Sequence, residues 1–435
     1  MADLPEAACL LQTGTQYHRR LGLKPPGGDL AFAGFKPGAF SVYFGDAPIY
    51  HFDLEGRWQR AFVAGIHYVK GLDGGVAAID RVREGKSLVL KRRSLPFAEA
   101  RDLDDAIWRM AMDVFAGMGT GTLGLVSPPE GIAPIAPAEL LEFLERIARW
   151  DAAAWFAQRE KYLGTYGVPP FLPPDGQNAM ILQATLGHAD GTAFGGAAPA
   201  EFHVRTASEF AEHVREVAAL FGRRVEQCRG IFLGGPDALR QPISDVAAWL
   251  EAVARVVPIA LASGSDRLSG VFAFLDQFSA PVPDAEGWRR LKRLHLRRVY
   301  LGVESGLPEV RAFFGKTWED ASLRATVTAL KEAGIEVGLI VLAGAGGLEG
   351  ADREEAATAA LLNGLVLGKL DVVALVSADE VGGVSSLALL ETLGRTPLTG
   401  PTRAERLASL RGRLAPTREK GVKVVPYSME KQGAG

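Results

Sequence analysis

YLGVES at residues 300–305 and EVGLIVLAG at residues 336–344 are short apolar runs, and a turn rich in glycine or polar residues follows each one. An amphipathic stretch lies between the two runs and stops at Gly334. Its apolar face is formed by Leu323, Val327 and Leu330. Apolar runs of this length are typical of buried strands, and a glycine behind a periodic stretch is typical of a helix end. This order predicts a strand, a helix and a second, parallel strand.

The same alternation extends on both sides, from residue 180 to residue 378. The six runs that we expect to be strands are MILQAT (180–185), GIFLGG (230–235), VPIALAS (257–263), RVYLGVES (298–305), EVGLIVLAG (336–344) and DVVALVSA (371–378). Thr206 and Glu209 have the spacing of a capping box and predict the start of one intervening helix. Because parallel strands require right-handed crossovers, the pattern predicts either an open doubly wound sheet or a partial barrel. Periodicity alone leaves both alternatives open.

The first part of the chain has a different pattern. Between about Leu30 and Leu95, runs rich in aromatic and β-branched residues alternate with glycine and aspartate turns, which predicts a small β-rich unit followed by two amphipathic helices. The prolines of VPPFLPPDG at residues 168–176 cannot continue a helix and predict a linker. The expected parts are an N-terminal β-rich and helical domain at 1–167, a proline-rich linker at 168–177, an α/β unit at 178–376 and a C-terminal extension at 377–435.

Composition and charge restrict the class of protein. The 435 residues are 48% apolar and 23% charged, which is the balance of a soluble globular protein. No apolar run is long enough to span a membrane and the start lacks the pattern of a signal peptide, so we expect a cytoplasmic protein without a membrane partner. A net charge of −3 with both signs well mixed predicts no nucleic-acid partner. Cys9 and Cys228 are too few and too far apart for a zinc ribbon, a ferredoxin-type cluster or a disulfide framework.

The loops behind the predicted strands are the candidate site, because parallel α/β folds bind ligands at the carboxyl ends of their strands. The distinctive loops are TLGHADGTAFGG (185–196), the pair Gly234 and Gly235, the pair Glu304 and Ser305, and AGAGG (343–347). Paired glycines let a ligand approach the backbone, and a carboxylate beside a hydroxyl can hold a ribose or an amino group. Each loop alone is a weak signal, since glycine-rich turns mostly serve the turn itself.

The order and spacing of these loops resemble a known superfamily. The segments that carry the resemblance are TLGHADGTAF (185–194), FHVRTASEFAEHVREVA (202–218), IFLGGPDAL (231–239), YLGVESGLPEV (300–310), LKEAGIEVGLIVLAGAGG (330–347) and AATAALLNGL (356–365). Together they are similar to the core of the radical S-adenosylmethionine (SAM) superfamily, in the branch of oxygen-independent coproporphyrinogen dehydrogenase and the Elongator catalytic subunit. The resemblance covers roughly residues 178–376 and implies a partial (β/α)6 barrel, similar to a TIM barrel.

The first loop departs from the family. Its relatives carry CxxxCxxC there, whose thiolates bind a [4Fe-4S] cluster that cleaves SAM reductively. Alignment of Thr185-Leu186-Gly187 with the family's TxG places His188, Thr192 and Gly195 at the three cysteine positions. Neutral threonine is a poor iron ligand and glycine has no side chain, so the resemblance predicts a degenerate iron–sulfur motif with no [4Fe-4S] cluster.

The other loops match the family better. By resemblance, Gly234 and Gly235 face the methionine end of SAM, and Glu304 and Ser305 face its ribose or carboxylate. The adenine is expected against the glycine-rich turn, at Gly344, Gly346 and Gly347. The expected function is that of a pseudoenzyme or regulatory subunit that binds SAM, a related nucleoside or a protein partner. Whether the chain is an enzyme at all is left open.

Two alternative functions stay open. His188, Asp190 and His203 could converge on a mononuclear Zn²⁺ or Fe²⁺ in the mouth of the barrel and support replaced chemistry. The chain could instead be a structural or interaction protein whose functional part is its first 170 residues. Five polar residues of that part are expected to form a hydrated sheet surface: Asp46, His51, Asp53, Glu55 and His67.

Overall fold

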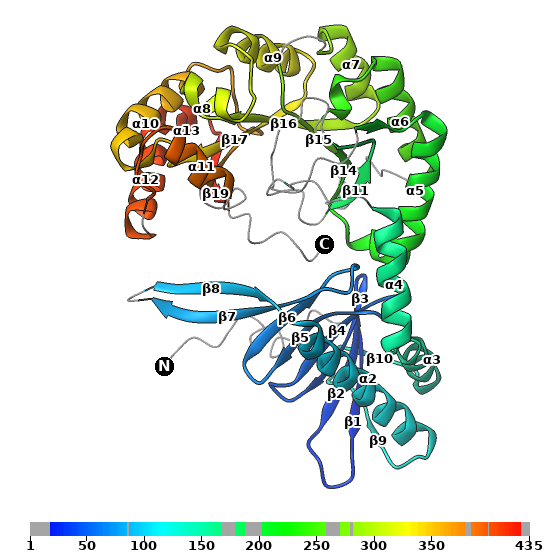
Figure 1. Cartoon of the computed structure of the whole chain (residues 1–435). Helices are drawn as coiled ribbons and strands as arrows, with labels where there is room; N and C mark the ends of the chain where they lie inside the picture. Colours follow the sequence, from blue (N-terminus) through cyan, green and yellow to red (C-terminus); the bar gives the residue numbers. More distant parts are fainter. Residues whose placement is uncertain are drawn as a thin grey trace. The chain divides into compact units, whose positions relative to one another are not determined.

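The structure is a computed structural model, and it describes ten ranges of the chain. These are residues 18–84, 87–166, 172, 179–187, 202–235, 237–257, 270–278, 282–378, 384–398 and 400–427. The chain divides into two compact units (Figure 1). The first comprises Met1–Thr165, Leu220–Gln227 and Gly433–Gly435, and the second comprises Tyr166–Ala219 and Cys228–Gln432. The division after Thr165 lies just before the predicted linker at 168–177, of which only Leu172 is among the described residues.

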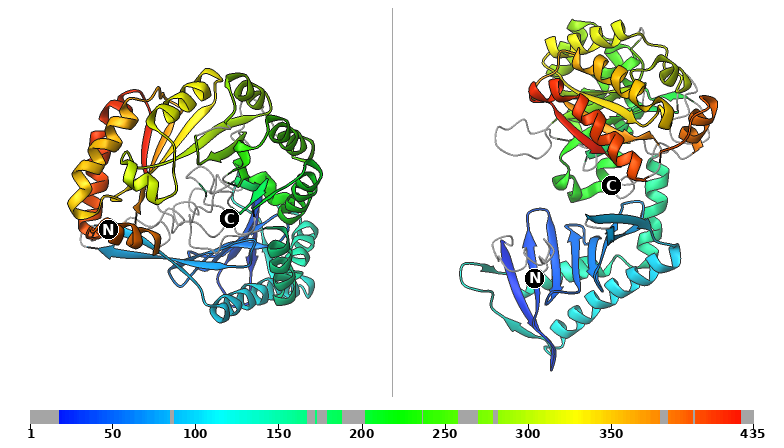
Figure 2. Two further views of the ribbon diagram at one scale, coloured as in Figure 1. Left: turned by 45° about the horizontal axis from the view of Figure 1, so that its top comes forward. Right: turned by 90° about the vertical axis from the view of Figure 1, so that its left-hand side faces the viewer.

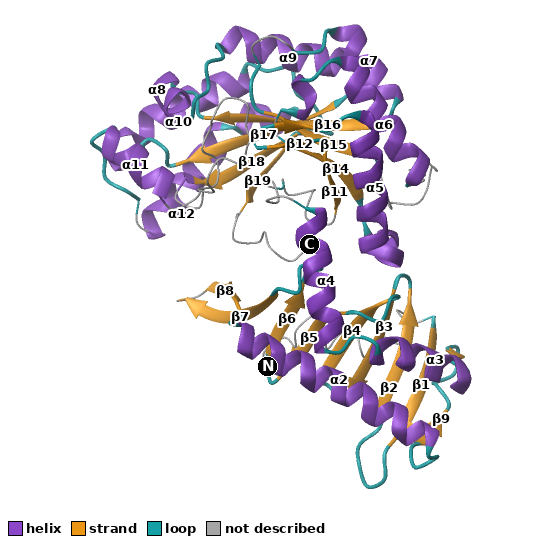
Figure 3. Ribbon diagram, turned by 45° about the vertical axis from the view of Figure 1, so that its right-hand side comes forward, coloured by secondary structure: helices purple, strands orange, loops and turns teal. Residues whose placement is uncertain are grey.

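The first unit is an antiparallel meander with helices on one face. Its eight main strands are β1 (Arg19–Lys24), β2 (Ala31–Lys36), β3 (Ala39–Phe44), β4 (Ile49–Asp53), β5 (Trp58–Val63), β6 (Ile66–Lys70), β7 (Val76–Glu84) and β8 (Ser87–Ser94). Each pairs with the next, while β9 (Gly124–Val126) and β10 (Ala133–Pro134) pair with β1. The helices are α2 (Phe97–Gly119), α3 (Pro137–Ala148) and α4 (Ala152–Thr165). Figure 3 shows α2 and α3 against the sheet. The predicted β-rich and helical domain is therefore observed.

Alternation along the strands explains how this sheet binds its helices. Phe40 and Val42 of β3 and Phe52 of β4 lie in the same buried cluster as Ile107 of α2 and Leu140 of α3. Every second strand residue points to the same face, so these residues supply one continuous apolar surface. Phe40 and Phe143 pack with ring centroids 4.5 Å apart. Burial of this surface holds the two layers together.

The second unit is built on seven parallel strands. They are β11 (Ala179–Gln183), β14 (Gly230–Gly234), β15 (Val271–Leu275), β16 (Leu296–Glu304), β17 (Glu336–Ala343), β18 (Val372–Ser377) and β19 (Lys423–Tyr427). Neighbours in the sheet follow chain order throughout, and every pair is parallel. A doubly wound sheet reverses its strand order at a switch point, whereas a barrel does not. The strand order therefore favours the predicted partial barrel over the doubly wound alternative.

Helices follow the strands as the alternation predicted. They are α5 (Ala207–Phe221), α6 (Ile243–Val256), α7 (Ala285–Arg293), α8 (Pro308–Phe313), α9 (Asp320–Glu332), α10 (Gly347–Asn363), α11 (Val384–Thr392), α12 (Gly400–Arg413) and α13 (Ala415–Glu419). In Figure 2, left, the larger helices of this unit form an outer arc around the curved sheet. Phe232, Phe274 and Tyr300, on three neighbouring strands, belong to one buried cluster of side chains. None of the described helices is long and apolar enough to cross a lipid bilayer.

One strand of the predicted barrel was wrong. The third strand was expected at 257–263, but β15 (Val271–Leu275) pairs with both β14 and β16. Val257 is instead the C-cap residue of α6. Residues 258–263 lie outside the described residues. Both runs are short and apolar, and periodicity cannot rank two such runs. β19, a strand that the sequence pattern did not predict, lies within the expected C-terminal extension at 377–435 and pairs with β18.

The reason β19 escaped prediction is its composition. Its sequence, KVVPY, contains Pro426 and is only five residues long. Proline lacks an amide hydrogen and is tolerated mainly on edge strands, so it counts against a strand in a sequence pattern. Among the described strands, β19 is the last of the sheet and pairs with β18 alone. The missing donor therefore costs the ladder little.

Candidate functional site

The two flanks of the first strand-end loop are paired with each other. β12 (Thr185–Leu186) and β13 (His203–Val204) form a short antiparallel ladder. The Ala184 amide donates to the Gly234 carbonyl at 3.1 Å, and the Arg205 amide donates to the Ala184 carbonyl at 3.0 Å. The loop between the flanks therefore begins and ends at the carboxyl edge of β11 and β14. His188, Asp190, Thr192 and Gly195 lie outside the described residues.

His203 lies beside the start of α5 and contacts Glu209. Its Nε2 lies 3.7 Å from Oε1 of Glu209, and both side chains are about half exposed, at 49% and 48%. Glu209 also accepts from the Thr206 amide at 2.7 Å, while the Glu209 amide donates to the Thr206 hydroxyl at 3.2 Å. The predicted capping box is confirmed. Among the described residues no group of three histidine, cysteine or acidic side chains is placed to hold a metal ion.

The glycine pair behind β14 packs closely against the chain itself. Gly235 has a positive φ of +100°, and a Cβ at that position would lie 1.9 Å from the Thr185 hydroxyl oxygen. A side chain there is excluded by both backbone conformation and contact. The Thr185 hydroxyl is buried and has no hydrogen-bond partner among the described residues. The turn at Gly234 and Gly235 is therefore closely packed against the Thr185 hydroxyl, which has no hydrogen-bond partner among the described residues.

A buried charged cluster lies at the carboxyl ends of β15 and β16. The Lys316 ammonium lies 3.1 Å from Oδ1 of Asp276 and 3.2 Å from Oε1 of Glu304. Lys316 and Glu304 are 1% and 2% exposed, so this contact is screened very little by solvent. A Cβ on Gly302 would lie within 3.0 Å of an atom from each of these three side chains. The cluster therefore requires glycine at position 302, because a side chain there would overlap it. Sequence reasoning found Glu304 and missed both of its partners.

Glu304 is strained as well as buried. Its φ is +60°, in the left-handed region that non-glycine residues rarely adopt, and a β-bulge separates Gly302 from Glu304 in the pairing with β17. Such a conformation costs on the order of 1–3 kcal/mol and persists where the surroundings impose it. Its second carboxylate oxygen, Oε2, is buried and has no hydrogen-bond partner among the described residues. This oxygen is the clearest unsatisfied acceptor at the strand ends.

The charges of this cluster shift each other's ionisation. Burial raises the pKa of the Glu304 carboxyl to about 7; Lys316 opposes the rise and Asp276 adds to it. Burial by itself lowers the pKa of the Lys316 ammonium, but Asp276 and Glu304 outweigh it, so that pKa is raised. Lys316 is therefore charged at neutral pH, while Glu304 is close to the middle of its titration. A carboxyl in that state can donate or accept a hydrogen bond.

The Ser305 hydroxyl is used inside the protein. It is fully buried, donates to Oε1 of Glu354 at 3.2 Å and accepts from the Leu307 amide at 3.1 Å. Glu354 of α10 also accepts from the Thr358 hydroxyl at 3.1 Å, but its Oε2 has no partner among the described residues. Burial raises the pKa of Glu354 to about 7, against the pull of the Thr358 and Ser305 hydroxyls. Ser305 thus connects the strand end to α10.

The glycine-rich turn behind β17 is enclosed by its own chain. A Cβ on Gly344 would lie 2.6 Å from Leu398, and one on Gly347 would lie 2.7 Å from the Arg395 side chain. On Gly346 it would lie 2.7 Å from the Gly350 carbonyl oxygen. These glycines therefore permit close packing against α10 and residues 390–398. That structural role is sufficient to explain them without a ligand.

Cys228 lies at the opposite edge of the sheet from these loops. It is buried and precedes β14, whose carboxyl end is Gly234. Five strand residues at about 3.3 Å each separate the two ends. The length of β14 therefore separates the Cys228 thiol from the carboxyl edge of the sheet.

The polar cluster expected on the surface of the first unit is partly buried. Asp53 is 0% exposed and forms an ion pair with Arg57 at 2.7 Å. His51 Nδ1 lies 2.7 Å from the Ser41 hydroxyl, and burial, followed by the nearby Lys36, Arg60 and His67, lowers its pKa to about 3. The prediction of a hydrated surface was therefore wrong for Asp53. Alternation places residues on a face, but it does not tell how deeply that face is covered.

No protein-family model and no curated protein matches the chain. Several solved structures do match the chain. TsrM from Kitasatospora setae, a radical SAM methyltransferase with tryptophan and a SAM analogue bound, is 13% identical with a TM-score of 0.38, over 60% of this chain and 56% of that one. OxsB, a cobalamin-dependent SAM radical enzyme, is 11% identical with a TM-score of 0.32, over 65% and 38%. HydG, a maturase of the [FeFe]-hydrogenase, is 13% identical with a TM-score of 0.31, over 76% and 71%.

The chain thus spans little more than half of TsrM and well under half of OxsB. TsrM and OxsB are radical SAM enzymes. The α/β class expected from the sequence, with a β-rich N-terminal part, is the class observed.

Proposed function

We propose that the second unit is a radical-SAM-like barrel that no longer assembles an iron–sulfur cluster and binds SAM or a related nucleoside at the carboxyl ends of its strands. The absence of thiolates carries the first half of the proposal. The loop at 185–196 contains no cysteine, and Cys228 lies at the amino edge of the sheet. Histidine, threonine and glycine do not fit a group that three thiolates normally hold. We therefore derive no radical chemistry for this chain.

The unsatisfied Glu304 carboxylate supports the second half. Leaving a buried acceptor without a partner costs about 1–3 kcal/mol, and a ligand that donates to it recovers that cost. Ribose hydroxyls and the SAM amino group are such donors. The Thr185 hydroxyl is a second unsatisfied group at the same edge of the sheet. A ligand at Glu304, Thr185, Gly234 and Gly235 can supply the missing hydrogen bonds of the Glu304 carboxylate and the Thr185 hydroxyl. Ser305 and the glycines at 344–347 contribute to this site through their packing inside the protein.

Reconstitution tests the loss of the cluster. The full chain is incubated anaerobically with iron and sulfide, and bound iron and the visible spectrum are measured. We expect neither stoichiometric iron nor a charge-transfer band. The matched control is the variant with His188→Cys, Thr192→Cys and Gly195→Cys, which is expected to acquire iron because the loop keeps the family's spacing. A stoichiometric four-iron cluster on the wild-type chain would refute the proposal.

Calorimetric titration with SAM tests the retained pocket. We expect binding that Glu304→Gln weakens about tenfold or more, because a hydrogen bond to a charged group contributes about 1.5–3 kcal/mol. Glu332→Gln, which alters an exposed residue of α9, is the control and should leave the affinity unchanged. Equal affinity in both variants, or no binding to the wild-type chain, contradicts a nucleoside site at Glu304.

A further inference from the structure

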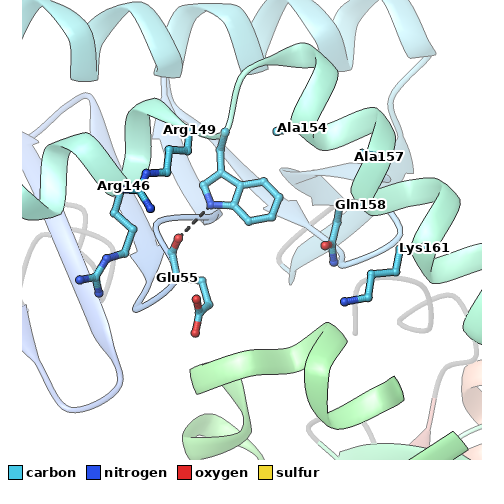
Figure 4. Close-up of a pocket in the computed structure, with 8 residues that line it drawn as sticks. Glu55, Arg146, Arg149, Ala154, Ala157, Gln158 and Lys161 are labelled. Atoms are coloured by element: carbon cyan, nitrogen blue, oxygen red, sulfur yellow. Dashed lines mark hydrogen bonds between the residues drawn. The ribbon is translucent and has the colours of Figure 1, made fainter. Parts of the chain in front are cut away.

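A pocket of about 490 Å³ lies within the first unit, far along the chain from the strand-end loops (Figure 4). Its walls come from the turn between β4 and β5, from the end of α3 and from α4. The residues that line it are Glu55, Arg146, Arg149, Trp150, Ala154, Ala157, Gln158 and Lys161. Pockets that hold small molecules span roughly 300–1,000 Å³, so this one is large enough for a nucleotide.

The floor of the pocket is one face of α4. Ala154, Ala157, Gln158 and Lys161 are spaced as residues of a single helical face. The two alanines keep the hollow open, because their side chains are short. Gln158 is fixed by the hydrogen bond from its amide nitrogen to the Leu72 carbonyl, at 3.4 Å. The side chains of a helix, and not those of a loop, therefore form this side of the pocket.

The charges around the hollow are unbalanced. Arg146, Arg149 and Lys161 contribute three cations, and Glu55 contributes one carboxylate. Arg149 and Lys161 make no hydrogen bond or ion pair from their side chains with the described residues. Figure 4 shows Arg146 and Arg149 on one side of the pocket and Lys161 on the other. Arg149 and Lys161, which have no carboxylate partner among the described residues, favour an anionic ligand.

The orientation of the remaining groups strengthens this charge pattern. Arg146 donates to the Leu54 carbonyl at 3.0 Å and to Glu142 at 3.2 Å, so its guanidinium is held in place with further donors available. Glu55 accepts from the Arg223 amide at its Oε1, at 2.9 Å, and its carboxylate still offsets one of the positive charges. With Arg146 paired to Glu142, the unpaired Arg149 and Lys161 exceed the single carboxylate of Glu55, so a small excess of positive charge is left for a ligand.

Trp150 provides an apolar wall beside the cations. Its indole nitrogen donates to the Glu55 carbonyl at 2.8 Å, and its ring packs against Trp155 with centroids 5.1 Å apart. Both contacts fix the indole, so a ligand that uses it meets a rigid surface. An aromatic wall between arginine and lysine side chains suits a ligand that combines a planar body with negative charge.

From this arrangement we infer that the pocket between α3 and α4 binds a nucleotide. Its nucleoside packs against Trp150, Ala154 and Ala157, and the cations at the two sides of the pocket, Arg149 and Lys161, attract its negative charge. Phosphate suits the arginines because the guanidinium donates two parallel hydrogen bonds to phosphate oxygens. This site is independent of the nucleoside site proposed at Glu304. The first unit would then sense or hold a phosphorylated ligand.

Titration of the full chain with ADP tests the inference. We expect Arg149→Glu and Lys161→Glu, combined in one variant, to weaken ADP binding about tenfold or more, because two favourable charges become repulsive. Trp150→Leu should weaken ADP binding and leave pyrophosphate binding unchanged, because pyrophosphate does not use the indole. Arg159→Glu is the matched control: it reverses one exposed charge of the same helix outside the pocket and should change the affinity less than twofold.

Three results would overturn the inference. One is the absence of ADP binding to the wild-type chain. Another is an equal loss of affinity in Arg159→Glu and in the double variant, which would indicate general electrostatic attraction. The third is a loss of ADP binding in Glu304→Gln with no loss in the double variant, which would assign the nucleotide to the second unit. Circular dichroism of each variant verifies that its fold is retained.

Discussion

The two units each bury a lysine, but they satisfy it to different degrees. In the first unit Lys70 lies 2.8 and 2.9 Å from the two carboxylate oxygens of Asp104, and 4.1 Å from the centre of the Trp155 ring. The Trp58 indole also donates to Asp104, at 2.7 Å. In the second unit Lys316 lies between Asp276 and Glu304, and one oxygen of Glu304 has no partner among the described residues.

The difference separates a stabilising network from a candidate binding site. Around Lys70 each carboxylate oxygen has a donor, and an ordered, satisfied network mainly fixes the fold. Next to Lys316, the backbone of Glu304 has a positive φ and the pKa of its carboxyl is raised to about 7. Its Oε2 has no hydrogen-bond partner among the described residues. Proteins retain such costs chiefly where a ligand offsets them. Buried charge alone is therefore a poor marker of function, whereas incomplete hydrogen bonding is a better one.

The largest expected effect is on the closed network. Lys70→Met removes the ion-pair partner of the partly buried Asp104 carboxylate. We therefore expect the free energy of unfolding of the first unit to fall by about 3–5 kcal/mol. Hydrogen exchange of peptides from β4–β6 at increasing urea concentration measures it. Arg93→Met, which removes an exposed ion pair with Glu99, is the control and should have almost no effect, because solvent screens that pair. Similar losses in both variants would argue against a special role for burial.

The open network should give the second unit an unusual dependence on pH. The folded-state pKa of Glu354 is about 7, above the usual 4.5, so the folded state holds a proton that the unfolded state releases. The free energy of unfolding should therefore fall as pH rises from about 4.5 to 7, on the order of 3 kcal/mol for this carboxyl. Glu304 contributes a change in the same direction.

Glu354→Gln checks this dependence, because an amide does not titrate in that range. Urea unfolding of the second unit at several pH values should give a flatter profile in the variant than in the wild type. The profiles should converge at low pH, where the wild-type carboxyl is protonated. Parallel profiles across the whole range would show that Glu354 has an ordinary pKa.

The smallest effect is expected at His203, whose ion pair is half exposed. His203→Gln should not shift the unfolding midpoint measurably, because exposed pairs contribute little. It also tests the mononuclear metal hypothesis. Elemental analysis of protein purified without a histidine tag should find no zinc or iron that depends on His203. Stoichiometric metal that disappears in the variant would revive that hypothesis and place the site in the 188–203 loop.

Local patterns were sufficient to predict much of the second unit. Gly334 has a φ of +73° behind α9, and Thr206 and Glu209 cap α5, both as expected. These features act within a few residues of the chain, where sequence spacing and spatial distance are nearly the same. The choice between two apolar runs for the third strand depended instead on which one pairs with β14 and β16, a contact between distant segments.

By itself the sequence determined the alternation of strands and helices, the positions of the strand-end loops and the lack of cysteine among them. The tertiary structure decided which loop residues are engaged. Ser305 appeared equal to Glu304 in the sequence, yet its hydroxyl is hydrogen bonded to Glu354. Glu304 contacts Lys316, which also contacts Asp276, and its Oε2 has no hydrogen-bond partner among the described residues. Lys316 is twelve residues from Glu304, and Asp276 belongs to another strand end. Hydrogen-bond satisfaction depends on groups brought together by folding, so no pattern within one segment reveals it.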